Sequence, residues 1–371
     1  LVRLRDSPPI AFDALIVAPG ARHAYFGHEE WETFAPGLKT MADAVRLREK
    51  LLRAFEEAER ERAATGTHHR LTFVIVGGGP TGVELAGALA EIGRKAMGPD
   101  FPSLQLDDLS ILLVEGGPRL LPAFAPHLSL KAVKGLERMG VTVKLNSLVS
   151  DVRADGVMIG SEWVRSTNVI WAAGNRASPL LGTLAVPQDP SGRVKVRPDL
   201  TIPDDPWIFV IGDGAHCADE QGTPLPGLAP VAMQQGRYVA GLIDQNQSPE
   251  QRRPFVYKNR GVLATIGRAQ AVAQFGPFHM SGVLAWFIWC FAHIFFLIGF
   301  RNRIRVISEW MWFYLTFKPG ARLIFNQPEV SRQTPPASEP SPQQGAAESG
   351  KGPAPPRLRV LKKQRTTSDG A

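Results

Sequence analysis

Three glycines placed between two apolar runs carry the clearest chemical signal in the sequence. Gly77, Gly79 and Gly82 have the spacing G-x-G-x-x-G; residues 73–76 (FVIV) come before them, and residues 83–90 (VELAGALA) come after. A short, apolar, β-branched run is typical of a buried strand of a parallel sheet, and the residues after the glycines favour a helix. Strand, glycine turn and helix are together the context in which this spacing binds a dinucleotide.

Each glycine of this fingerprint has a chemical task. Gly77 permits the tight turn, Gly79 lets the backbone approach a pyrophosphate, and Gly82 lets helix and strand pack closely. The N-terminus of the following helix adds free N–H groups and a partial positive charge, which favour an anion. The other interpretation is a chance glycine turn, because the chain has 36 glycines. The flanking strand and helix favour the dinucleotide.

An acidic residue ends the next apolar run. Residues 110–114 (SILLV) predict a second strand, and Glu115 follows them, where a carboxylate accepts hydrogen bonds from the ribose hydroxyls of NAD. The interval from Gly82 is longer than the usual ~20 residues, because residues 97–108 (MGPDFPSLQLDD) form an insertion. Because Glu115 is acidic, we expect the chain to bind NADH rather than NADPH. Arg119 is the residue that leaves NADPH as an alternative, since an arginine can bind the extra phosphate. The alternative role of Glu115 is to cap the sheet edge.

Length and cysteine usage limit the class of protein. The chain has 371 residues, of which 44% are hydrophobic, enough for two globular units with cores of their own. Its two cysteines, Cys217 and Cys290, are far apart and form no C-x-x-C motif. This argues against a disulfide framework, a zinc site and a dithiol redox centre. We expect no metal site and a reducing compartment.

The net charge of +7 does not indicate a nucleic-acid partner once its location is considered. Between Ser331 and Ala371 there are seven basic and three acidic residues, so +4 of the total belongs to this C-terminal segment. The segment is rich in Pro, Ser, Gln and Gly, a composition typical of disorder. Its basic cluster at 357–365 could contact anionic lipid, but a solvated tail is the favoured interpretation.

The rest of the chain supplies further elements around the fingerprint. Residues 42–62 have a long amphipathic pattern that predicts a helix. Short apolar runs predict strands at 14–18, 141–145, 168–172 and 208–211, and a helix is expected from about Pro230. Strands and helices that alternate in this way indicate an α/β fold.

Residues 281–300 (SGVLAWFIWCFAHIFFLIGF) form an apolar segment that is followed at once by Arg301, Arg303 and Arg305. A run of about 20 apolar residues is just long enough to span a bilayer. A second aromatic cluster at 310–315 (WMWFYL), together with the basic flank, equally suits helices that lie in the membrane interface. Both arrangements are open, and burial in an ordinary core is a third.

The order of these motifs resembles one family, the single-subunit, non-proton-pumping type II NADH dehydrogenases, which are FAD-containing NADH:quinone oxidoreductases. The resemblance rests on the segments APGARHAYFGHEEWETFAPGLKT, TFVIVGGGPTGVELAGALAEI, LLVEGGPRLLP, VIWAAGN, IFVIGDGA and PLPGLAPVAMQQGRYVA, which occur in this order. It covers about Phe12 to Phe325. It implies an α/β fold with two Rossmann-like dinucleotide-binding domains, one for FAD and one for NADH, and C-terminal amphipathic helices that associate with a membrane.

The resemblance also assigns cofactor contacts to single residues. Asp213 of the G-D motif would hydrogen-bond the ribitol of FAD, Gly20 would lie near the flavin, and Gly212 would be a further cofactor-binding residue. Ala173 and Gly174 would approach the NADH side. These roles come from the family pattern and add to the dinucleotide site that the fingerprint indicates.

Two further residues would serve the reaction itself. Glu84 stands where the family has a glutamate near the nicotinamide and the flavin; its other interpretation is a first-turn acid that complements the helix dipole. Gln234 occupies the second position of a glutamine pair, four residues apart, that the family commonly places at the quinone site. Pro230 occupies the first position, so Gln234, Gln235 and backbone groups are left to contact the quinone.

One departure from the family is larger. A full member begins with a strand, a G-x-G-x-x-G turn and a helix that bind the FAD pyrophosphate, whereas this sequence has one fingerprint, which we assign to NADH. We therefore expect the FAD domain to lack its N-terminal βαβ unit. The expected divisions are 1–67, a remnant of the FAD domain with a linking helix; 68–197, the NADH-binding domain; 198–250, the second FAD segment; 251–330, the membrane-associating region; and 331–371, the disordered tail.

The resemblance implies an enzyme that passes electrons from NADH through FAD to a membrane quinone without pumping protons. Two alternatives are open: a soluble FAD- and NAD(P)H-dependent reductase of the same fold, and a truncated remnant that binds NADH and membrane without catalysis. The family further implies a homodimer and a peripheral position on the cytoplasmic face of a bacterial inner membrane, held through residues 281–325.

Overall fold

The computed structural model describes residues 1–66, 70–93, 100–105, 108–297 and 299–316. The chain divides into two compact units. The first unit holds Leu1–Ala21 and Ala177–Tyr257, and the second holds Arg22–Arg176 together with the described residues from Lys258 onward.

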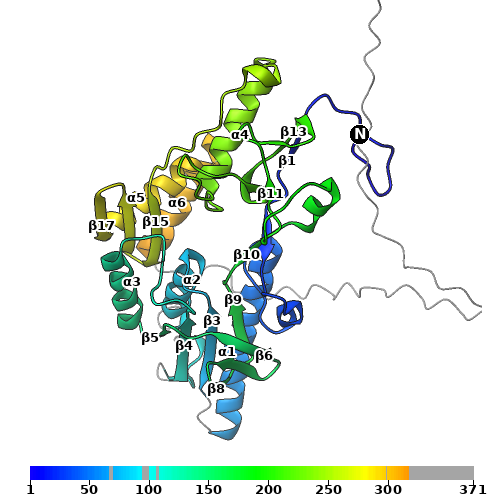
Figure 1. The fold of residues 1–371 in the computed structure, drawn as a ribbon. Helices are drawn as coiled ribbons and strands as arrows, with labels where there is room; N and C mark the ends of the chain where they lie inside the picture. The colour runs from blue at the N-terminus through cyan, green and yellow to red at the C-terminus, as the bar shows by residue number, and fades with distance from the viewer. Residues whose placement is uncertain (67–69, 94–99, 106–107, 298, 317–371) are drawn as a thin grey trace, which may run out of the picture. The chain divides into compact units, whose positions relative to one another are not determined.

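A four-stranded parallel sheet forms the centre of the second unit (Figure 1). Its strands, in spatial order, are β5 (Val141–Lys144), β4 (Leu109–Val114), β3 (Leu71–Val76) and β9 (Asn168–Trp171). Val76 pairs with Val114 on one side and with Trp171 on the other. The turns that follow β3, β4 and β9 therefore meet at one edge of the sheet.

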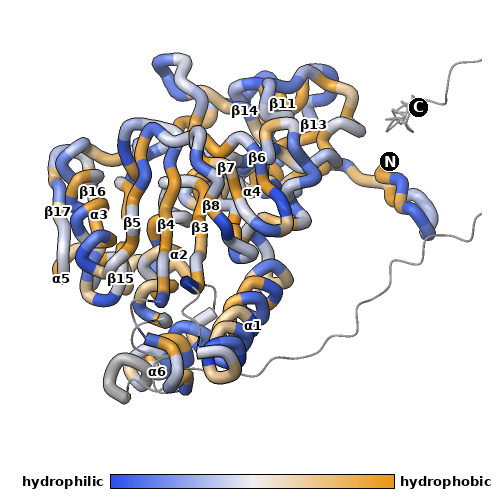
Figure 2. The backbone as a smooth tube through the Cα atoms, turned by 90° about the horizontal axis from the view of Figure 1, so that it is seen from below, coloured by the Kyte–Doolittle hydropathy of each residue, from blue (hydrophilic) through white to orange (hydrophobic). Residues whose placement is uncertain are grey.

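Both faces of this sheet are buried, because its side chains alternate between two cores. Phe73 and Ile75 of β3 belong to one core, and Val74 and Val76 belong to the other. Three helices contribute to the first core: α1 (Met41–Thr65), α2 (Pro80–Glu91) and α3 (Pro126–Arg138). An antiparallel sheet contributes to the second: β6 (Val149–Arg153), β7 (Gly156–Ile159) and β8 (Glu162–Arg165). The strands β3 and β4 are accordingly apolar along most of their length (Figure 2).

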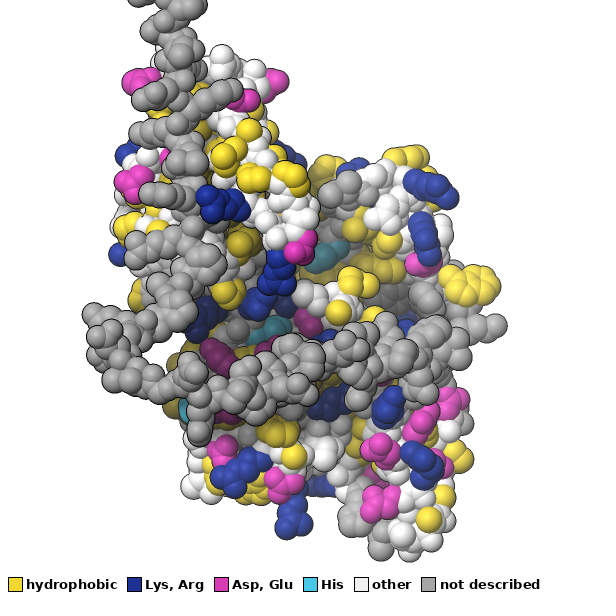
Figure 3. Space-filling view, turned by 90° about the vertical axis from the view of Figure 1, so that its right-hand side faces the viewer, with side chains coloured by type: hydrophobic (Ala, Val, Ile, Leu, Met, Phe, Trp, Pro, Cys, Tyr) yellow, Lys and Arg dark blue, Asp and Glu magenta, His cyan; other side chains and the backbone are white. Residues whose placement is uncertain are grey.

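The ends of α1 follow from its sequence. Asp43 and Thr40 form a capping box, in which the Asp43 N–H donates to Thr40 Oγ1 (3.1 Å) and the Thr40 N–H donates to Asp43 Oδ2 (2.8 Å). At the other end Gly66 has φ +66°, and its N–H donates to the carbonyl oxygen of Arg62 (2.9 Å). The sequence of α1 carries charges of both signs. On the side of the molecule shown in Figure 3, acidic and basic side chains are also interspersed.

A second antiparallel sheet and two helices complete the second unit. The sheet consists of β15 (Val262–Gly267), β16 (Gln270–Phe275) and β17 (Phe278–Gly282); the helices are α5 (Val283–Phe296) and α6 (Phe300–Thr316). β15 packs against α2. The apolar run at 281–300 is therefore not one helix, because it begins in a strand and Gly299, with φ +84°, precedes α6. Within the described residues, no helix combines the length and the apolar character that crossing a membrane requires.

A three-stranded sheet forms the centre of the first unit. Its strands are β1 (Leu15–Val17), β13 (Asp205–Val210) and β12 (Thr201–Ile202). β1 and β13 are parallel, with Val17 opposite Val210, so the residues that follow them lie at the same edge. α4 (Ala229–Asp244) packs on the turn after β13.

Short elements fill the remaining segments. They are the paired strands β11 (Val194–Lys195) and β14 (Ala215–His216), the paired strands β2 (Ala21–His23) and β10 (Asn175–Ala177), and the 3-10 helices η1 (Glu29–Thr33), η5 (Pro179–Leu184), η6 (Gly212–Gly214) and η7 (Pro249–Gln251).

The elements expected from the sequence are confirmed with shifts of a few residues. The expected helices are α1, α2 and α4, and the expected strands are β1, β3, β4, β5, β9 and β13. The tail at 331–371 lies outside the described residues, and so do residues 97–99 and 106–107 of the insertion at 97–108. The units divide after Ala21, Arg176 and Tyr257, whereas the sequence divides after 67, 197 and 250. Which cofactor each part holds stays a prediction.

Candidate functional site

The fingerprint glycines form the turn between β3 and α2, and two of them exclude any side chain. Gly77 has φ +114°, and a Cβ there would lie 2.7 Å from the backbone of Ala172 and Ala173. A Cβ on Gly82 would lie 1.8 Å from the carbonyl oxygen of Gly77. Both obstacles are backbone atoms, so no rotation of a side chain relieves them. Gly79, by contrast, has no described atom within 4 Å of its Cβ position, which leaves open space where a pyrophosphate would approach.

The start of α2 suits an anion. Gly79 is the N-cap and Pro80 follows; in the described structure this N-cap makes no side-chain hydrogen bond, and the first turn contains no acidic residue. The helix dipole and the N–H groups of an uncapped first turn together attract a phosphate. The interpretation of Glu84 as a first-turn acid is therefore wrong, because this residue lies one turn further along the helix.

Glu115 lies between the fingerprint turn and the loop after β4. Its Oε2 accepts the N–H of Gly78 (2.6 Å), and its Oε1 accepts the N–H of Gly117 (2.7 Å). A carboxylate has about four acceptor positions, so among the described residues about two remain for the hydroxyls of a ribose. Glu115 thus braces the turn and still fits the adenosine ribose of NADH. Arg119, which kept NADPH open, donates to the carbonyl oxygen of Pro122 (2.8 Å).

Ala173 and Gly174 follow β9 and lie beside the same turn. The Ala172 N–H donates to the carbonyl oxygen of Val76 (2.8 Å), which continues the sheet hydrogen bonds to its edge. Gly174 has φ +70°, a left-handed conformation that glycine adopts without strain. Since Ala172 and Ala173 are the residues that exclude a side chain on Gly77, the structure brings this segment to the edge that holds the fingerprint.

Glu84 extends from α2 toward β15. Its Oε1 accepts the N–H of Thr265 (3.2 Å). Burial raises the pKa of Glu84 above its ordinary value, and the Thr265 N–H and the indole of Trp289 oppose this in part. Trp289 Nε1 is buried and makes no hydrogen bond of full geometry among the described residues. It is nevertheless near enough to Glu84 to lower the pKa of that carboxyl. Glu84 is thus a carboxyl that holds a proton more readily than an exposed one.

Trp289 connects Glu84 to the C-terminal helices. Its indole stacks on Trp310 of α6, with ring centroids 5.8 Å apart and planes at 6°, and its ring centroid lies 4.0 Å from that of His293. Sequence reasoning missed both Trp289 and Thr265 as neighbours of Glu84, since Thr265 is 181 residues away along the chain. The one signal was a tryptophan inside an apolar segment, for which a bilayer span, the membrane interface and an ordinary core were all open.

In the first unit, the residues expected to contact FAD follow two neighbouring strands. Gly20 comes after β1 and Gly212 after β13, and each has φ +69°. Because these strands are parallel and paired, the two glycines lie at the same edge. Asp213 is half-buried in η6, and its Oδ1 would lie 3.2 Å from a Cβ on Gly227. The missing side chain at Gly227 leaves room beside this carboxylate.

Two neighbouring glutamines of α4 differ in their surroundings. Gln235 is only 1% exposed, and its Oε1 accepts the N–H of Gly212 (2.7 Å). It therefore holds the glycine–aspartate turn, and the expectation that it contacts a quinone is wrong. Gln234 is half-buried, and its contact with the quinone stays a prediction.

The described residues of the first unit fit one part of FAD. A carboxylate accepts hydrogen bonds from hydroxyl groups, so Asp213 suits a polyol chain such as ribitol. The glycines at 20 and 212 let the backbone pass close to a flat ring. The sequence has a single G-x-G-x-x-G, which lies in the second unit, so we assign no residue to the FAD pyrophosphate.

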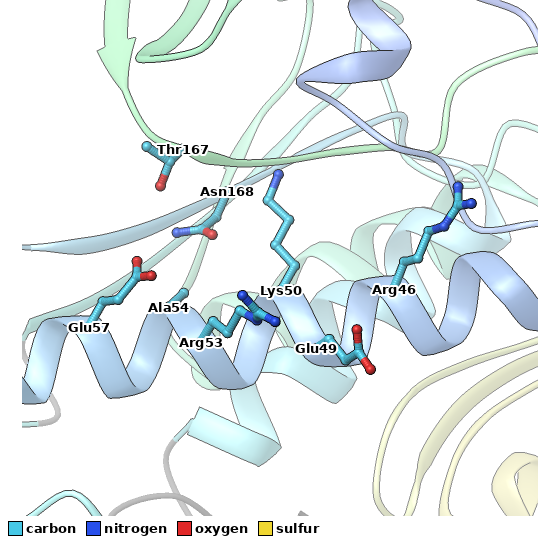
Figure 4. Close-up of a pocket in the computed structure, with 8 residues that line it drawn as sticks. All are labelled: Arg46, Glu49, Lys50, Arg53, Ala54, Glu57, Thr167 and Asn168. Carbon is cyan, nitrogen blue, oxygen red and sulfur yellow. The ribbon is translucent and has the colours of Figure 1, made fainter. Parts of the chain in front are cut away.

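A cavity of about 370 Å³ lies between α1 and the start of β9 (Figure 4). It is lined by Arg46, Glu49, Lys50, Arg53, Ala54, Glu57, Thr167 and Asn168. In Figure 4 Lys50 points from α1 toward the segment before β9; its Nζ donates to the carbonyl oxygen of Phe34 (3.2 Å), and burial lowers its pKa. β9 begins at this cavity, whereas the fingerprint turn follows the other ends of the strands. The cavity is therefore separate from the dinucleotide site.

Comparison with known proteins defines the class first. The family model of the pyridine nucleotide-disulphide oxidoreductases matches residues 2–236, and that of the NDH2 C-terminal domain matches residues 259–317. The structure of NDH2 from Plasmodium falciparum in complex with NADH has a TM-score of 0.75 at 20% identity and covers 84% of this chain and 79% of its own. The fold is that of a pyridine nucleotide-disulphide oxidoreductase.

Relatives define the family more narrowly. The chain is 40% identical over 313 residues to the type II NADH:quinone oxidoreductase NdhA of Mycobacterium tuberculosis, and 37% identical over 333 residues to Ndh of the same organism. The matches cover 81% and 86% of this chain, and 66% and 71% of the relatives. The chain belongs to the type II NADH:quinone oxidoreductase family, which confirms the predicted resemblance. It spans about two thirds of the length of these relatives.

Proposed function

We propose that this chain oxidises NADH and passes the electrons through FAD to a membrane quinone, without pumping protons. The observation that supports this most directly is the meeting of the fingerprint turn, Glu115 and the segment after β9 at one edge of a parallel sheet. FAD, when bound, supplies the two-electron chemistry that amino-acid side chains lack.

The second unit would bind and orient NADH. The start of α2 would hold the pyrophosphate, with Gly79 leaving space for it. Glu115 would accept hydrogen bonds from the adenosine ribose, which favours NADH over NADPH. Ala173 and Gly174 would border the nicotinamide end, because β9 lies on the opposite side of β3 from β4.

The first unit would hold the ribitol and ring side of FAD. Asp213 would accept hydrogen bonds from ribitol, and Gly20 and Gly212 would let the backbone lie close to the flavin. Gln235 supports this arrangement, because it fixes the N–H of Gly212. The assignment of 198–250 to FAD and of 68–197 to NADH is part of the proposal.

Glu84 would hold a proton for the reaction, and Gln234 would contact the quinone. Reduction of a quinone to a quinol consumes two protons, so a carboxyl with a raised pKa is suited to hold one of them. Burial gives Glu84 that property. Gln234 would donate a hydrogen bond to a quinone carbonyl.

The C-terminal helices would rest on a membrane surface. Exposed apolar side chains recur at helical spacing on both helices: Leu284, Phe287, Phe291 and Phe295 on α5, and Phe300, Ile304, Ile307 and Met311 on α6. Arg301, Arg303 and Arg305 stand beside them. Apolar stripes with adjacent basic residues favour a helix that lies in the interface of an anionic membrane. A peripheral position on the cytoplasmic face of a bacterial inner membrane and a homodimer are further parts of the proposal.

The test is NADH oxidation by the purified full chain with FAD supplied, measured with and without a short-chain quinone. We expect oxidation that depends on the quinone. A chain that binds ADP-ribose but oxidises no NADH under these conditions would contradict the enzyme and favour the non-catalytic remnant. Activity without any binding to lipid vesicles would favour the soluble reductase.

A further inference from the structure

Phe26 has a backbone conformation and an exposure that its packing does not explain. Its φ is +55°, in the left-handed region that bulky residues rarely adopt. Its side chain is also 70% exposed, so no burial of the ring offsets the strain. Strained residues of this kind concentrate at ligand sites, and the position of Phe26 indicates which ligand.

The loop that carries Phe26 is held against the end of β9. The indole N–H of Trp171 donates to the carbonyl oxygen of Ala24 (3.0 Å), and the Ala24 N–H donates to that of Gly174 (3.4 Å). A Cβ on Gly174 would lie 2.6 Å from Phe26 Cζ, so glycine at this position is what lets the ring approach. Tyr25 also fixes the loop, since its hydroxyl donates to the carbonyl oxygen of Ala35 (2.9 Å). The ring is thus exposed but held in place.

This position lies next to the fingerprint. Gly174 continues the segment whose preceding residues, Ala172 and Ala173, pack on Gly77. The strand order is β4, β3, β9. A dinucleotide with its ribose at Glu115 after β4 and its pyrophosphate after β3 must direct its nicotinamide end toward β9. Phe26 stands at that end.

We propose that the ring of Phe26 is a platform on which the nicotinamide of NADH stacks. It is a positioning residue: it holds the nicotinamide ring in place and takes no part in the hydride transfer. The inference rests on the proposed function, because it requires NADH in the fingerprint groove. Stacking between flat rings stabilises a complex beyond the effect of the apolar area that is buried. The loss of conformational entropy on binding is small because the loop of Phe26 is already fixed by hydrogen bonds.

The experiment compares two ligands on the full chain. NADH has the nicotinamide and ADP-ribose lacks it, so a platform affects only the first. Phe26→Asn removes the ring and keeps a residue that tolerates the left-handed conformation; Phe26→Tyr restores a ring. Phe278→Asn is the matched control, because Phe278 on β17 is 71% exposed. Binding is measured by anaerobic calorimetry without quinone, on the chain with any bound flavin already reduced, so that NADH binds without being oxidised.

We expect Phe26→Asn to weaken NADH binding by about five- to tenfold and to leave ADP-ribose binding unchanged. Phe26→Tyr and Phe278→Asn should bind both ligands as the original chain does. If Phe26→Asn bound NADH as tightly as the original chain does, or lost the same affinity for NADH and for ADP-ribose, this inference would be overturned and the proposed function would not. Failure of the original chain to bind either ligand would overturn the proposed function and this inference with it.

Discussion

At the scale of single residues, the candidate dinucleotide site requires glycine where a Cβ would collide with the backbone. Gly82→Ala would place a Cβ 1.8 Å from the carbonyl oxygen of Gly77, so the turn must move. We expect NADH binding to fall at least about tenfold and the free energy of unfolding to fall by about 1–3 kcal/mol. Urea denaturation and NADH titration measure the two effects.

Gly241→Ala is the control for this substitution. Gly241 lies inside α4 and has no described atom within 4 Å of its Cβ position. Alanine should therefore raise the free energy of unfolding by about 0.5–1 kcal/mol and leave NADH binding unchanged. Similar behaviour of the two variants would show that the fingerprint turn has no special steric requirement.

Glu84 predicts a dependence of stability on pH. Its pKa is raised in the folded chain relative to the ordinary 4.5, so on raising the pH the unfolded state loses its proton first. The stability that the protonated carboxyl contributes is full below pH 4.5 and is lost as the pH rises through the folded pKa. Glu84→Gln does not titrate. The free energy of unfolding of this variant should therefore rise relative to that of the original chain between pH 4.5 and the folded pKa, and the difference should be constant at higher pH. Urea denaturation at a series of pH values tests this, and a constant difference would refute a raised pKa.

At the scale of elements, Trp289 joins α5 to the carboxyl on α2. Trp289→Phe keeps an aromatic ring for stacking on Trp310 and removes the indole N–H that lowers the pKa of Glu84. We expect the pKa of Glu84 to rise further, so the pH dependence of quinone reduction should shift to higher pH. Trp312→Phe makes the same change at a side chain that is 59% exposed and should leave the profile in place. Identical profiles for both variants would contradict the coupling.

The exposed stripe of α5 predicts membrane binding. Phe291 and Phe295 are 70% and 55% exposed and lie one helical turn apart. Their joint replacement by Glu should reduce co-sedimentation with anionic vesicles by at least about tenfold, because two apolar anchors become charges. Leu180→Glu changes a side chain of similar exposure, 54%, on η5 and should have no effect. Unchanged sedimentation of the double variant would remove α5 from the membrane contact.

Much of the element order follows from local sequence, and the contacts between elements do not. The strands beside the fingerprint are predictable because apolar, β-branched runs and glycine turns act over a few residues. The strand β17 at the start of the apolar run was not predicted, since it depends on pairing with β16. Likewise no local pattern shows that Gln235 supports Gly212 or that Trp289 faces Glu84.

At the scale of the whole molecule, the proposed function divides the reaction between the two units. The second unit carries the glycine fingerprint, the half-buried Glu84 and the apolar helices, and the first carries Asp213 with its glycine turns. The central claim requires that flavin bound by this chain accept electrons from NADH and return them to a quinone. The sequence has a single fingerprint, so these residues would bind flavin without a second G-x-G-x-x-G turn.

The most direct measurement is the visible absorption spectrum of the detergent-purified chain under anaerobic conditions. We predict a flavin spectrum that bleaches when NADH is added and returns when a short-chain quinone follows. A colourless chain that still binds NADH, or a flavin that NADH does not bleach, would contradict the proposed electron path.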